Sequence, residues 1–207
     1  MSLFITFEGI EGSGKTTQIK LLKNALQKKG YKVRVTREPG GTPISDQIRQ
    51  VLLNRKNKSM VPLTELFLYE ASRAQHVEEV IRPALQKKMI VISDRYSDAT
   101  TVYQGEARKL SPVLVKYLNQ VATRHLKPNL TLVLDCAVHH GLSRARKRSE
   151  KSKFNRFEQE KDHFHDKIRK GYLALAKKEP RRVKVVHGDR PPLMIHQDIL
   201  KLVLKSL

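Results

Sequence analysis

Short apolar runs alternate with longer amphipathic segments along the whole chain. Residues 89–93, for example, read MIVIS, a continuous apolar run of the kind expected in a parallel strand that is buried on both faces. The longer segments repeat apolar residues at i, i+3, i+4 and i+7, which is the helical period. Strands that alternate with helices in this way predict a three-layer α/β fold, with a five-stranded parallel sheet flanked by helices.

The predicted strands cover residues 3–7, 32–36, 89–93, 130–135 and 182–187. The predicted helices cover a segment that begins after Gly14 and ends at Gly30, then residues 44–53, 63–86, 111–123, about 159–177 and about 193–204. Proline has no N–H and clashes with the preceding turn, so Pro83 should kink or split the helix at 63–86. The 207 residues suit a single domain, without an internal repeat or a long linker.

The loop between the first strand and the first helix reads Gly9-x-x-x-x-Gly14-Lys15-Thr16, the spacing of a phosphate-binding loop. Glycines have no Cβ, so successive N–H groups can turn toward phosphate oxygens, and the helix adds the positive end of its dipole. Lys15 supplies a point charge, and the Thr16 hydroxyl can ligate magnesium. A chance match on a Gly-rich turn is the alternative, but the strand and helix on either side favour a nucleoside triphosphate site. Its candidate residues are Gly9, Ile10, Glu11, Gly12, Ser13, Gly14, Lys15 and Thr16.

Charged residues follow two other strands, at the sheet edge where ligands bind in open α/β folds. Arg37 and Glu38 follow the second strand, and Asp94 follows the third. Asp94 is a candidate magnesium ligand beside Thr16, with a helix-capping aspartate as the alternative. Arg73 stands within an apolar helix face, and arginine is almost never fully buried without a partner, so this face should line a pocket.

Lysine and arginine total 41 against 20 acidic residues, a formal charge of +21. Such a field favours anionic ligands and non-specific nucleic-acid adsorption. Because the charges are spread over most predicted helices, we expect no specific nucleic-acid partner. Cys136 is the only cysteine, which excludes an intramolecular disulfide, and no apolar run reaches the length of a membrane span or a signal peptide. We therefore expect a cytoplasmic protein without a membrane partner.

Five motifs in this order resemble the thymidylate kinase family in its bacterial form: FEGIEGSGKTTQ, TREPGG, EASRAQH, DRYSDATTVYQG and NRFEQE. The resemblance extends along nearly the whole chain. It implies a P-loop kinase domain over residues 1–207 that transfers the γ-phosphate of ATP to dTMP, giving dTDP and ADP. It also implies dependence on Mg²⁺ and a homodimer.

The same resemblance implies roles for individual residues. It places Glu8 and Glu38 at the sugar of the acceptor and its phosphate, Arg37 in the same loop as Glu38, and Arg95 on the phosphate. It directs Arg49 toward the sugar and base and sets Tyr103 against C2′. At the base, it stacks Tyr69 on thymine, directs Arg73 toward the base carbonyl, and puts Thr100 and Gln104 at the base edge. Tyr69 stands where the family usually has Phe, and Thr100 where it usually has Ser. For Tyr69 a core-filling role is the alternative, and for Arg49 a solvated helix charge.

One branch of the family has an arginine in the phosphate loop, at the position that this chain fills with Gly12. Glycine cannot reach the transferred phosphoryl group, whose charge still has to be neutralised. A basic run from Arg144 to Arg156 lies where the family has its lid, at about residues 143–158. We therefore expect lid arginines, Arg148 and Arg156 first, to act with Lys15 and Arg95 in catalysis; a solvated basic loop is the alternative.

Two other functions remain open on the sequence. The nearer one is a nucleoside monophosphate kinase of the same fold that acts on a different base, since only residues 69, 73, 100 and 104 argue for thymine. The other is a nucleic-acid-binding P-loop ATPase, suggested by the charge. Against it, the chain has none of the aromatic and basic patterns that read RNA.

Overall fold

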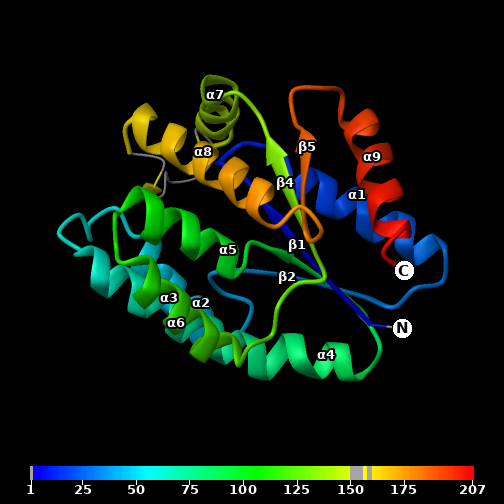
Figure 1. Cartoon of the computed structure of the whole chain (residues 1–207), viewed down its shortest axis with the longest axis horizontal. Coiled ribbons are helices and arrows are strands. Elements are labelled where there is room, and N and C mark those ends of the chain that lie inside the picture. Colours follow the sequence, from blue (N-terminus) through cyan, green and yellow to red (C-terminus); the bar gives the residue numbers. More distant parts are fainter. Residues whose placement is uncertain (1, 150–155, 158–159) are drawn as a thin grey trace.

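A five-stranded sheet forms the centre of the molecule (Figure 1). The computed structural model describes residues 2–149, 156–157 and 160–207. All neighbouring strands are parallel, in the order β2-β3-β1-β4-β5. The strands are β1 (Leu3–Glu8), β2 (Val33–Arg37), β3 (Ile90–Asp94), β4 (Leu130–Asp135) and β5 (Val183–His187). The predicted α/β fold with helices flanking a parallel sheet is confirmed.

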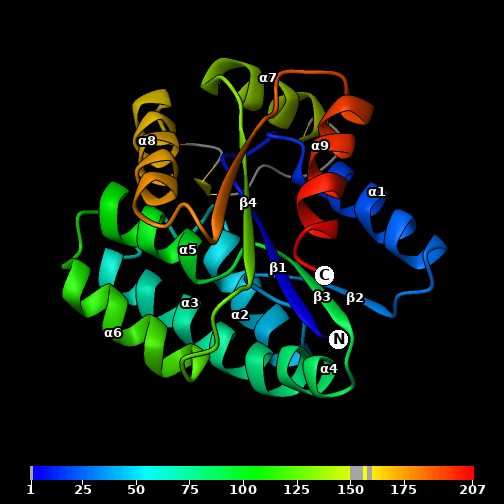
Figure 2. The same cartoon turned by 45° about the vertical axis from the view of Figure 1, so that its right-hand side comes forward.

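Helices cover both faces of this sheet (Figure 2). The α-helices are α1 (Lys15–Lys28), α2 (Pro43–Leu53), α3 (Pro62–His76), α4 (Arg82–Gln86), α5 (Ser97–Thr100), α6 (Pro112–Thr123), α7 (Val138–Ser149), α8 (Asp162–Lys178) and α9 (Pro192–Leu204). Two π-helical segments, η1 (Val77–Ile81) and η2 (Thr101–Ala107), lie between them. Helices α1 and α9 pack together on one face, while α8 packs on η2, β4 and β5 on the other.

The core divides along the same two faces, because successive side chains of a strand point to opposite sides. Ile5 and Phe7 of β1 pack toward apolar residues of α1 and α9, whereas Phe4 packs with Val77 and Val91 on the opposite face. A further apolar cluster joins η2 and β4 to α8. Burial on both faces explains why the strands read as continuous apolar runs rather than alternating ones.

The helix expected at 63–86 is interrupted, as Pro83 led us to expect, but the break lies one turn earlier. The π-helical segment η1 separates α3 from α4, and Pro83 stands in the first turn of α4. The reason is that proline lacks an N–H and its ring crowds the carbonyl four residues before it, at Glu79. A wider π turn accommodates this missing hydrogen bond without ending the helical path.

Three other segments differ from the sequence expectation. Residues 97–107, for which the sequence predicted no helix, form α5 and η2, and the first part of the basic run that begins at Arg144 lies in α7. The long helix expected from about 159 begins at Asp162. In α5, η2 and α7 many positions are polar or charged, so the apolar periodicity is too sparse to reveal a helix.

Strand order positions the site. After β1 the chain forms β2 and then β3 on one side of β1, and afterwards β4 and β5 on the other side, so the direction of strand addition reverses at β1. In open α/β sheets, ligands bind at the carboxyl ends of the strands beside such a reversal. The phosphate loop follows β1 at this point. In the described part of the chain, no helix is long and apolar enough to cross a membrane.

Candidate active site

The phosphate loop joins β1 to α1 through three glycines with positive φ: Gly9 at 131°, Gly12 at 71° and Gly14 at 98°. Side chains rarely adopt this backbone region. Gly12 is also needed for space, because a Cβ there would lie 1.9 Å from the Gly141 carbonyl oxygen of α7. Gly14 begins α1 without a side-chain cap, so the first N–H groups of the helix remain available for an anion.

Lys15 is buried, and its ammonium lies inside the loop. Nζ donates to the carbonyl oxygens of Gly9 at 3.1 Å and Ile10 at 2.8 Å, and to the Ser13 hydroxyl at 3.4 Å. Burial, aided by the nearby Arg95 charge, lowers the pKa of Lys15 to about 8. The loop therefore holds a cation that is poorly solvated and that would gain from an anionic ligand.

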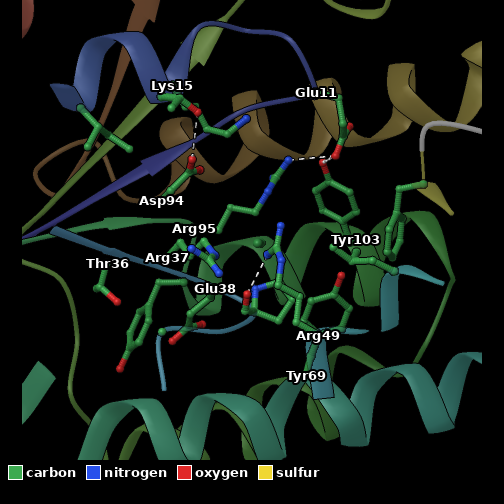
Figure 3. Close-up of a pocket in the computed structure, with 18 of the residues that line it drawn as sticks. Glu11, Lys15, Thr36, Arg37, Glu38, Arg49, Tyr69, Asp94, Arg95 and Tyr103 are labelled. Carbon is green, nitrogen blue, oxygen red and sulfur yellow. Dashed lines mark hydrogen bonds and ion pairs between the residues drawn. The ribbon is translucent and has the colours of Figure 1, made fainter. Parts of the chain in front are cut away.

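The loop opens into a cavity of about 770 Å³. Its wall comes from elements far apart in the sequence: the phosphate loop, the ends of β2 and β3, α3, α5 and η2. In Figure 3, Lys15 and Asp94 lie on one side of the cavity, Glu38 and Arg49 on the other, and Arg95 crosses the space between them. The cavity thus connects the triphosphate loop to the residues assigned to an acceptor nucleotide.

Arg95 links the two sides of the cavity. Its Nη2 donates to Glu11 Oε1 at 2.9 Å, and its Nη1 donates to the Gly9 carbonyl oxygen at 3.1 Å and to the Tyr172 hydroxyl at 3.3 Å. The guanidinium also lies 4.9 Å from the centre of the Tyr103 ring. Arg95 has a φ of 72°, an uncommon backbone conformation that is found more often at functional sites.

The Glu11 carboxylate lies on the acceptor side, although the sequence motif places this residue in the triphosphate loop. Its Oε1 accepts from Arg95 and, at 2.9 Å, from the Tyr103 hydroxyl, while Oε2 lies 3.3 Å from His165 Nδ1. Burial opposes ionisation, but the Arg95 charge and the His165 contact outweigh it and hold the pKa of Glu11 well below its usual range. The Glu11 side chain therefore presents a negative charge to the acceptor half of the cavity.

Glu8 is fully buried at the end of β1. Its oxygens accept from the Tyr96 N–H at 2.8 Å and the Tyr172 hydroxyl at 2.7 Å. Burial raises the pKa of Glu8 to about 8, against the opposing charge of Arg95. Glu8 therefore orients Tyr96 and Tyr172 from beneath the site.

Glu38, after β2, is held by two side chains of α3. Arg73 Nε donates to Glu38 Oε2 at 2.8 Å, and His76 Nδ1 lies 2.9 Å from Oε1. The far ring nitrogen of His76 lies 2.6 Å from the Thr36 hydroxyl. Arg73 is 1% exposed and also donates to Glu70, Asn119 and the Tyr96 carbonyl oxygen. The expected burial partners of Arg73 are thus present, and the arginine lines the cavity.

The proposed base pocket combines one aromatic ring with three polar groups. Tyr69, Thr100 and Gln104 all line the cavity. The Thr100 hydroxyl is completely buried and has no hydrogen-bond partner among the described residues. Four of the five Arg73 N–H groups are bonded, which leaves one Nη2–H without an acceptor in the described part of the chain. Unpaired buried polar groups at a cavity wall indicate where a ligand supplies the missing partners.

Arg37 and Arg49 lie at the mouth of the same half of the cavity. Arg49 Nη1 donates to the Pro39 carbonyl oxygen at 2.7 Å. Burial and the neighbouring Arg37 lower the pKa of Arg49. Arg37 pairs with Asp46 at 3.0 Å, although both side chains are largely exposed. Together they bring positive charge to the pocket entrance.

Asp94 and Thr16 meet as the sequence predicted. The Thr16 hydroxyl lies 3.5 Å from Asp94 Oδ2, and both residues line the cavity. A carboxylate beside a hydroxyl supplies the oxygen ligands that Mg²⁺ prefers. No group of three or more His, Cys, Asp or Glu suited to a metal occurs among the described residues. A site with one or two protein ligands is the kind that Mg²⁺ uses when nucleotide phosphates and water complete its coordination.

The predicted lid arginines occupy different places. The side chain of Arg148 lies outside the described residues. Arg156 is 7% exposed and donates to Glu65 Oε2 at 2.5 Å and to the Leu52 carbonyl oxygen at 3.1 Å, so it is not at the phosphate loop in this conformation. Arg144 lines the cavity and lies 3.5 Å from Asp189.

Several residues that hold the site together were not predicted. Glu65, His76, Asn119, His165 and Tyr172 are all buried polar residues that contact residues predicted to bind substrate. Glu65 and His76 occur at helical spacing from Tyr69 and Arg73, which is a signal that the sequence offered. The contacts of His165 and Tyr172 join α8 to the phosphate loop and β1, and no local pattern reveals such a pairing.

The comparisons with known proteins agree on one family. A family model described as thymidylate kinase matches residues 7–199. The curated thymidylate kinase of Geotalea daltonii is 56% identical over 192 residues, which cover 91% of this chain and 90% of that protein. The chain belongs to the thymidylate kinase family. The family assignment made from the motifs is thereby confirmed.

Two further relatives of the family span almost the full chain. The thymidylate kinase of Pelobacter propionicus is 51% identical over 209 residues, covering 100% of this chain and 95% of the relative. A crystal structure of thymidylate kinase from Ehrlichia chaffeensis superposes with a TM-score of 0.78 at 33% identity, covering 98% of both chains. Family membership thus rests on the whole fold and not on the phosphate loop alone.

Proposed function

We propose that the cavity transfers the γ-phosphoryl group of ATP to dTMP, giving dTDP and ADP. The observation that carries this proposal is that the phosphate loop and the acceptor pocket open into one cavity, with Arg95 between them. The thymidylate kinase family consists of phosphotransferases that act on dTMP. The other monophosphate kinases and the nucleic-acid ATPase considered from the sequence are not supported by the family match.

In this conformation, the Lys15 ammonium donates to the carbonyl oxygens of Gly9 and Ile10. Neutral carbonyl oxygens are weaker partners for a buried cation than charged phosphate oxygens. On the donor side, the phosphates of ATP therefore replace these loop oxygens around Lys15. Gly9 to Thr16 then hold the phosphates through backbone N–H groups and the N-terminus of α1. Lys15 neutralises the β- and γ-phosphates as charge develops in the transition state.

Thr16 and Asp94 would hold Mg²⁺. The ion would supply positive charge against the negative charge of the nucleotide phosphates. The fit rests on the proximity of the Thr16 hydroxyl and the Asp94 carboxylate at the cavity wall. The protein fixes the Thr16 hydroxyl in the first turn of α1, after the phosphate loop, and the Asp94 carboxylate at the end of β3.

On the acceptor side, Arg95 binds the phosphate of dTMP by exchanging partners. Arg95 pairs with Glu11 in this conformation and lines the cavity, where the phosphate of dTMP takes the place of the Glu11 carboxylate. Glu38 remains held by Arg73 and His76, which fixes the β2 end of the pocket. The acceptor phosphate oxygen then attacks the γ-phosphorus in line, so catalysis consists of positioning and charge neutralisation without a covalent enzyme intermediate.

At the base end, Tyr69 stacks on thymine, and Arg73, Thr100 and Gln104 face its edge. The fifth Arg73 N–H, which the four hydrogen bonds of this guanidinium leave free, suits a base carbonyl. The unpaired Thr100 hydroxyl suits a second polar group. Tyr103, fixed by Glu11 and the Arg95 guanidinium, closes the sugar side where a 2′-hydroxyl would need space.

The test is a set of initial rates of ADP release with dTMP, dUMP, GMP and CMP as acceptors. We expect dTMP to give the highest kcat/KM, and no ADP release that depends on DNA or RNA without an acceptor. A higher kcat/KM for GMP or CMP would contradict the proposed acceptor. ADP release stimulated by nucleic acid alone would contradict the reaction class.

We also propose a homodimer. Val113, Tyr117 and Val121 are spaced by four residues on α6 and are 79%, 61% and 56% exposed, so they form an apolar stripe on one helix face. Leu63 and Phe67 extend it onto the neighbouring α3. Contiguous exposed apolar side chains of this kind are typical of subunit contacts. A second copy of the chain, related by a twofold axis, would cover this apolar stripe with its own copy of the stripe.

Sedimentation tests this dimer. The variant Tyr117→Glu should sediment as a monomer, and an unchanged dimer would place the interface elsewhere.

A further inference from the structure

Glu65 is a completely buried carboxylate just behind the base pocket. It lies in the first turn of α3, four residues before Tyr69. Gln104 Nε2 lies 2.7 Å from its Oε1. Two arginines also donate to it: Arg108 at 3.3 and 3.4 Å, and Arg156 at 2.5 Å. Glu65 itself does not line the cavity, whereas Gln104 does.

These contacts determine which way the Gln104 amide is turned. A guanidinium can only donate hydrogen bonds, so the two arginines make the Glu65 carboxylate an acceptor. An ionised carboxylate has no hydrogen to give, so the Gln104 group that meets it must be the NH₂ and not the oxygen. The opposite end of the amide, Oε1, accepts no hydrogen bond from any of the described residues. Because the NH₂ faces Glu65 outside the cavity, and Oε1 is not among the buried atoms that lack a partner, we place the oxygen on the side of Gln104 that lines the cavity.

We propose that Glu65 sets the base specificity of the acceptor site by fixing the Gln104 amide with its oxygen toward the base. Glu65 is a positioning residue, because it acts through Gln104 and does not touch the nucleotide. The inference rests on the proposed function, in which thymine occupies this pocket. In thymine, the Gln104 oxygen would accept from the ring N–H at N3, and the neighbouring carbonyl at C4 suits the free Arg73 N–H.

Cytosine presents the opposite pattern at both positions. Its N3 is an acceptor facing the Gln104 oxygen, and its amino group faces the Arg73 donor. Each mismatch leaves a buried polar group unpaired, at about 1 to 3 kcal/mol. A site that hydrogen-bonds a substrate N–H rejects analogues that lack it far better than a merely apolar pocket can. A freely rotating amide would present either end and would discriminate poorly.

The decisive variant is Glu65→Gln, which keeps the shape and replaces one oxygen by NH₂. Arg156 can only donate, so the oxygen that remains at position 65 stays on Arg156. The new NH₂ at position 65 then faces Gln104, and the Gln104 amide has to turn its oxygen toward it. The probe is a pair of acceptors, dTMP and its 3-deaza analogue, in which C–H replaces N3–H. We expect the wild-type protein to favour dTMP in kcat/KM by about 5- to 150-fold, the value of one hydrogen bond to a buried group. In Glu65→Gln this preference should fall toward one.

A matched control removes another partner of Glu65 without touching the amide. Arg108→Met keeps an apolar stem against Phe164 and Phe157, which the guanidinium now covers at 4.7 and 5.9 Å. We expect this variant to keep the wild-type preference for dTMP over the analogue, even where its overall rate falls. A merely structural role for Glu65 would lower both rates in Glu65→Gln and leave their ratio unchanged.

A second measurement covers the case in which Glu65→Gln does not fold. In the wild-type protein, the side-chain amide resonance of Gln104, assigned by its loss in Gln104→Met, should show protons protected from solvent exchange before and after dTMP is added. Freely exchanging protons would overturn the proposal, as would an unchanged preference in folded Glu65→Gln. If wild-type protein did not use dTMP at all, the proposed function itself would fail, which is a distinct result.

Discussion

The phosphate loop and the acceptor pocket share one cavity but are stabilised in different ways. The loop is one continuous segment whose shape comes from backbone conformation, with positive φ at Gly9, Gly12 and Gly14. The pocket is assembled from β2, α3, β3 and η2, and its shape comes from ion pairs between side chains, such as Arg73 with Glu38 and Glu70. The donor side therefore depends on a few backbone positions, whereas the acceptor side depends on charges that hold one another in place.

This difference determines how each half should respond to substitution. Removing a side chain from the loop removes one function and leaves the backbone in place. Removing a charge from the pocket leaves a buried partner unpaired, which costs more than the lost contact. The buried Arg73 is the clearest case, since its carboxylate partners Glu38 and Glu70 are almost inaccessible to water.

The largest effect should come from Lys15→Ala. The ammonium is the charge that the loop presents to phosphate, and its loss should cost about 3 to 4 kcal/mol of transition-state stabilisation, a 100- to 1000-fold decrease in rate. The variant should remain folded because glycine conformations, not Lys15, shape the loop. Steady-state kinetics and a thermal melt check both points. A folded variant with full activity would remove the phosphate loop from the mechanism.

The next effect concerns the lid arginines. We propose that Arg148 and Arg156 reach the phosphates when the lid closes, and each change to Ala should lower kcat by about 10- to 100-fold, the value of a charge-assisted hydrogen bond. For Arg148→Ala the KM for dTMP should change less than kcat, because this contact would exist only in the transition state. Arg156 pairs with the buried Glu65 in this conformation, so Arg156→Ala should raise the KM for dTMP as well as lower kcat.

If Arg144, Arg146, Arg148 and Arg156 could all be changed to Ala with less than about a threefold loss of kcat, roughly 0.6 kcal/mol, the lid would have no such part. Arg169→Ala is a suitable control, because Arg169 lies on α8 and pairs with Asp135 rather than with any residue assigned to substrate.

An effect of comparable size, but on KM rather than on kcat, should come from Tyr69→Ala on the acceptor side. Base–aromatic stacking is worth about 1 to 3 kcal/mol, so the KM for dTMP should rise by about 5- to 150-fold while that for ATP stays nearly constant. Tyr69→Phe should be almost silent because stacking needs the ring and not the hydroxyl. Equal losses for both substrates would show that Tyr69 fills the core instead.

The smallest effect should be a pH dependence on the donor side. Burial lowers the pKa of Lys15 to about 8 in the free protein, so the ammonium is charged at pH 7 and loses its proton as the pH rises through 8. ATP affinity should then weaken by up to about tenfold per pH unit above 8 in the wild type. The gap between the wild type and Lys15→Ala should narrow between pH 7 and pH 9. Titrations of ATP at each pH measure this, and a constant gap would contradict it.

The two halves also differ in how much the sequence reveals about them. The phosphate loop, its lysine and the Thr16–Asp94 pair follow from local spacing and from residues at strand ends, which are readable without a structure. The roles of Arg73 and Tyr69 were accessible only as a helix face and a family resemblance. The helical spacing of Glu65 and His76 was visible in the sequence, but their partners, like that of His165, come from elements far away in the chain and became apparent only in three dimensions.

Where the fold has local features that the sequence interpretation did not contain, the reason is also physical. The helix at 63–86 contains a π turn before Pro83 because one backbone hydrogen bond is missing there. Residues 101–107 form a second π-helical segment that lines the cavity with Tyr103 and Gln104. π turns have no distinctive apolar period and occur often at functional sites, so a periodicity argument misses them.

The most direct test of a shared cavity is the binding of a single ligand that joins both nucleotides. Adenosine and thymidine linked through their 5′ oxygens by five phosphates would place one end at the phosphate loop and the other at Tyr69. Linking two ligands makes the second contact intramolecular, so calorimetry should show a Kd at least about 100-fold below that of ATP. The Lys15→Ala and Tyr69→Ala variants should each weaken it. A Kd no lower than that of ATP, or one unaffected by Tyr69→Ala, would contradict a cavity that holds donor and acceptor together.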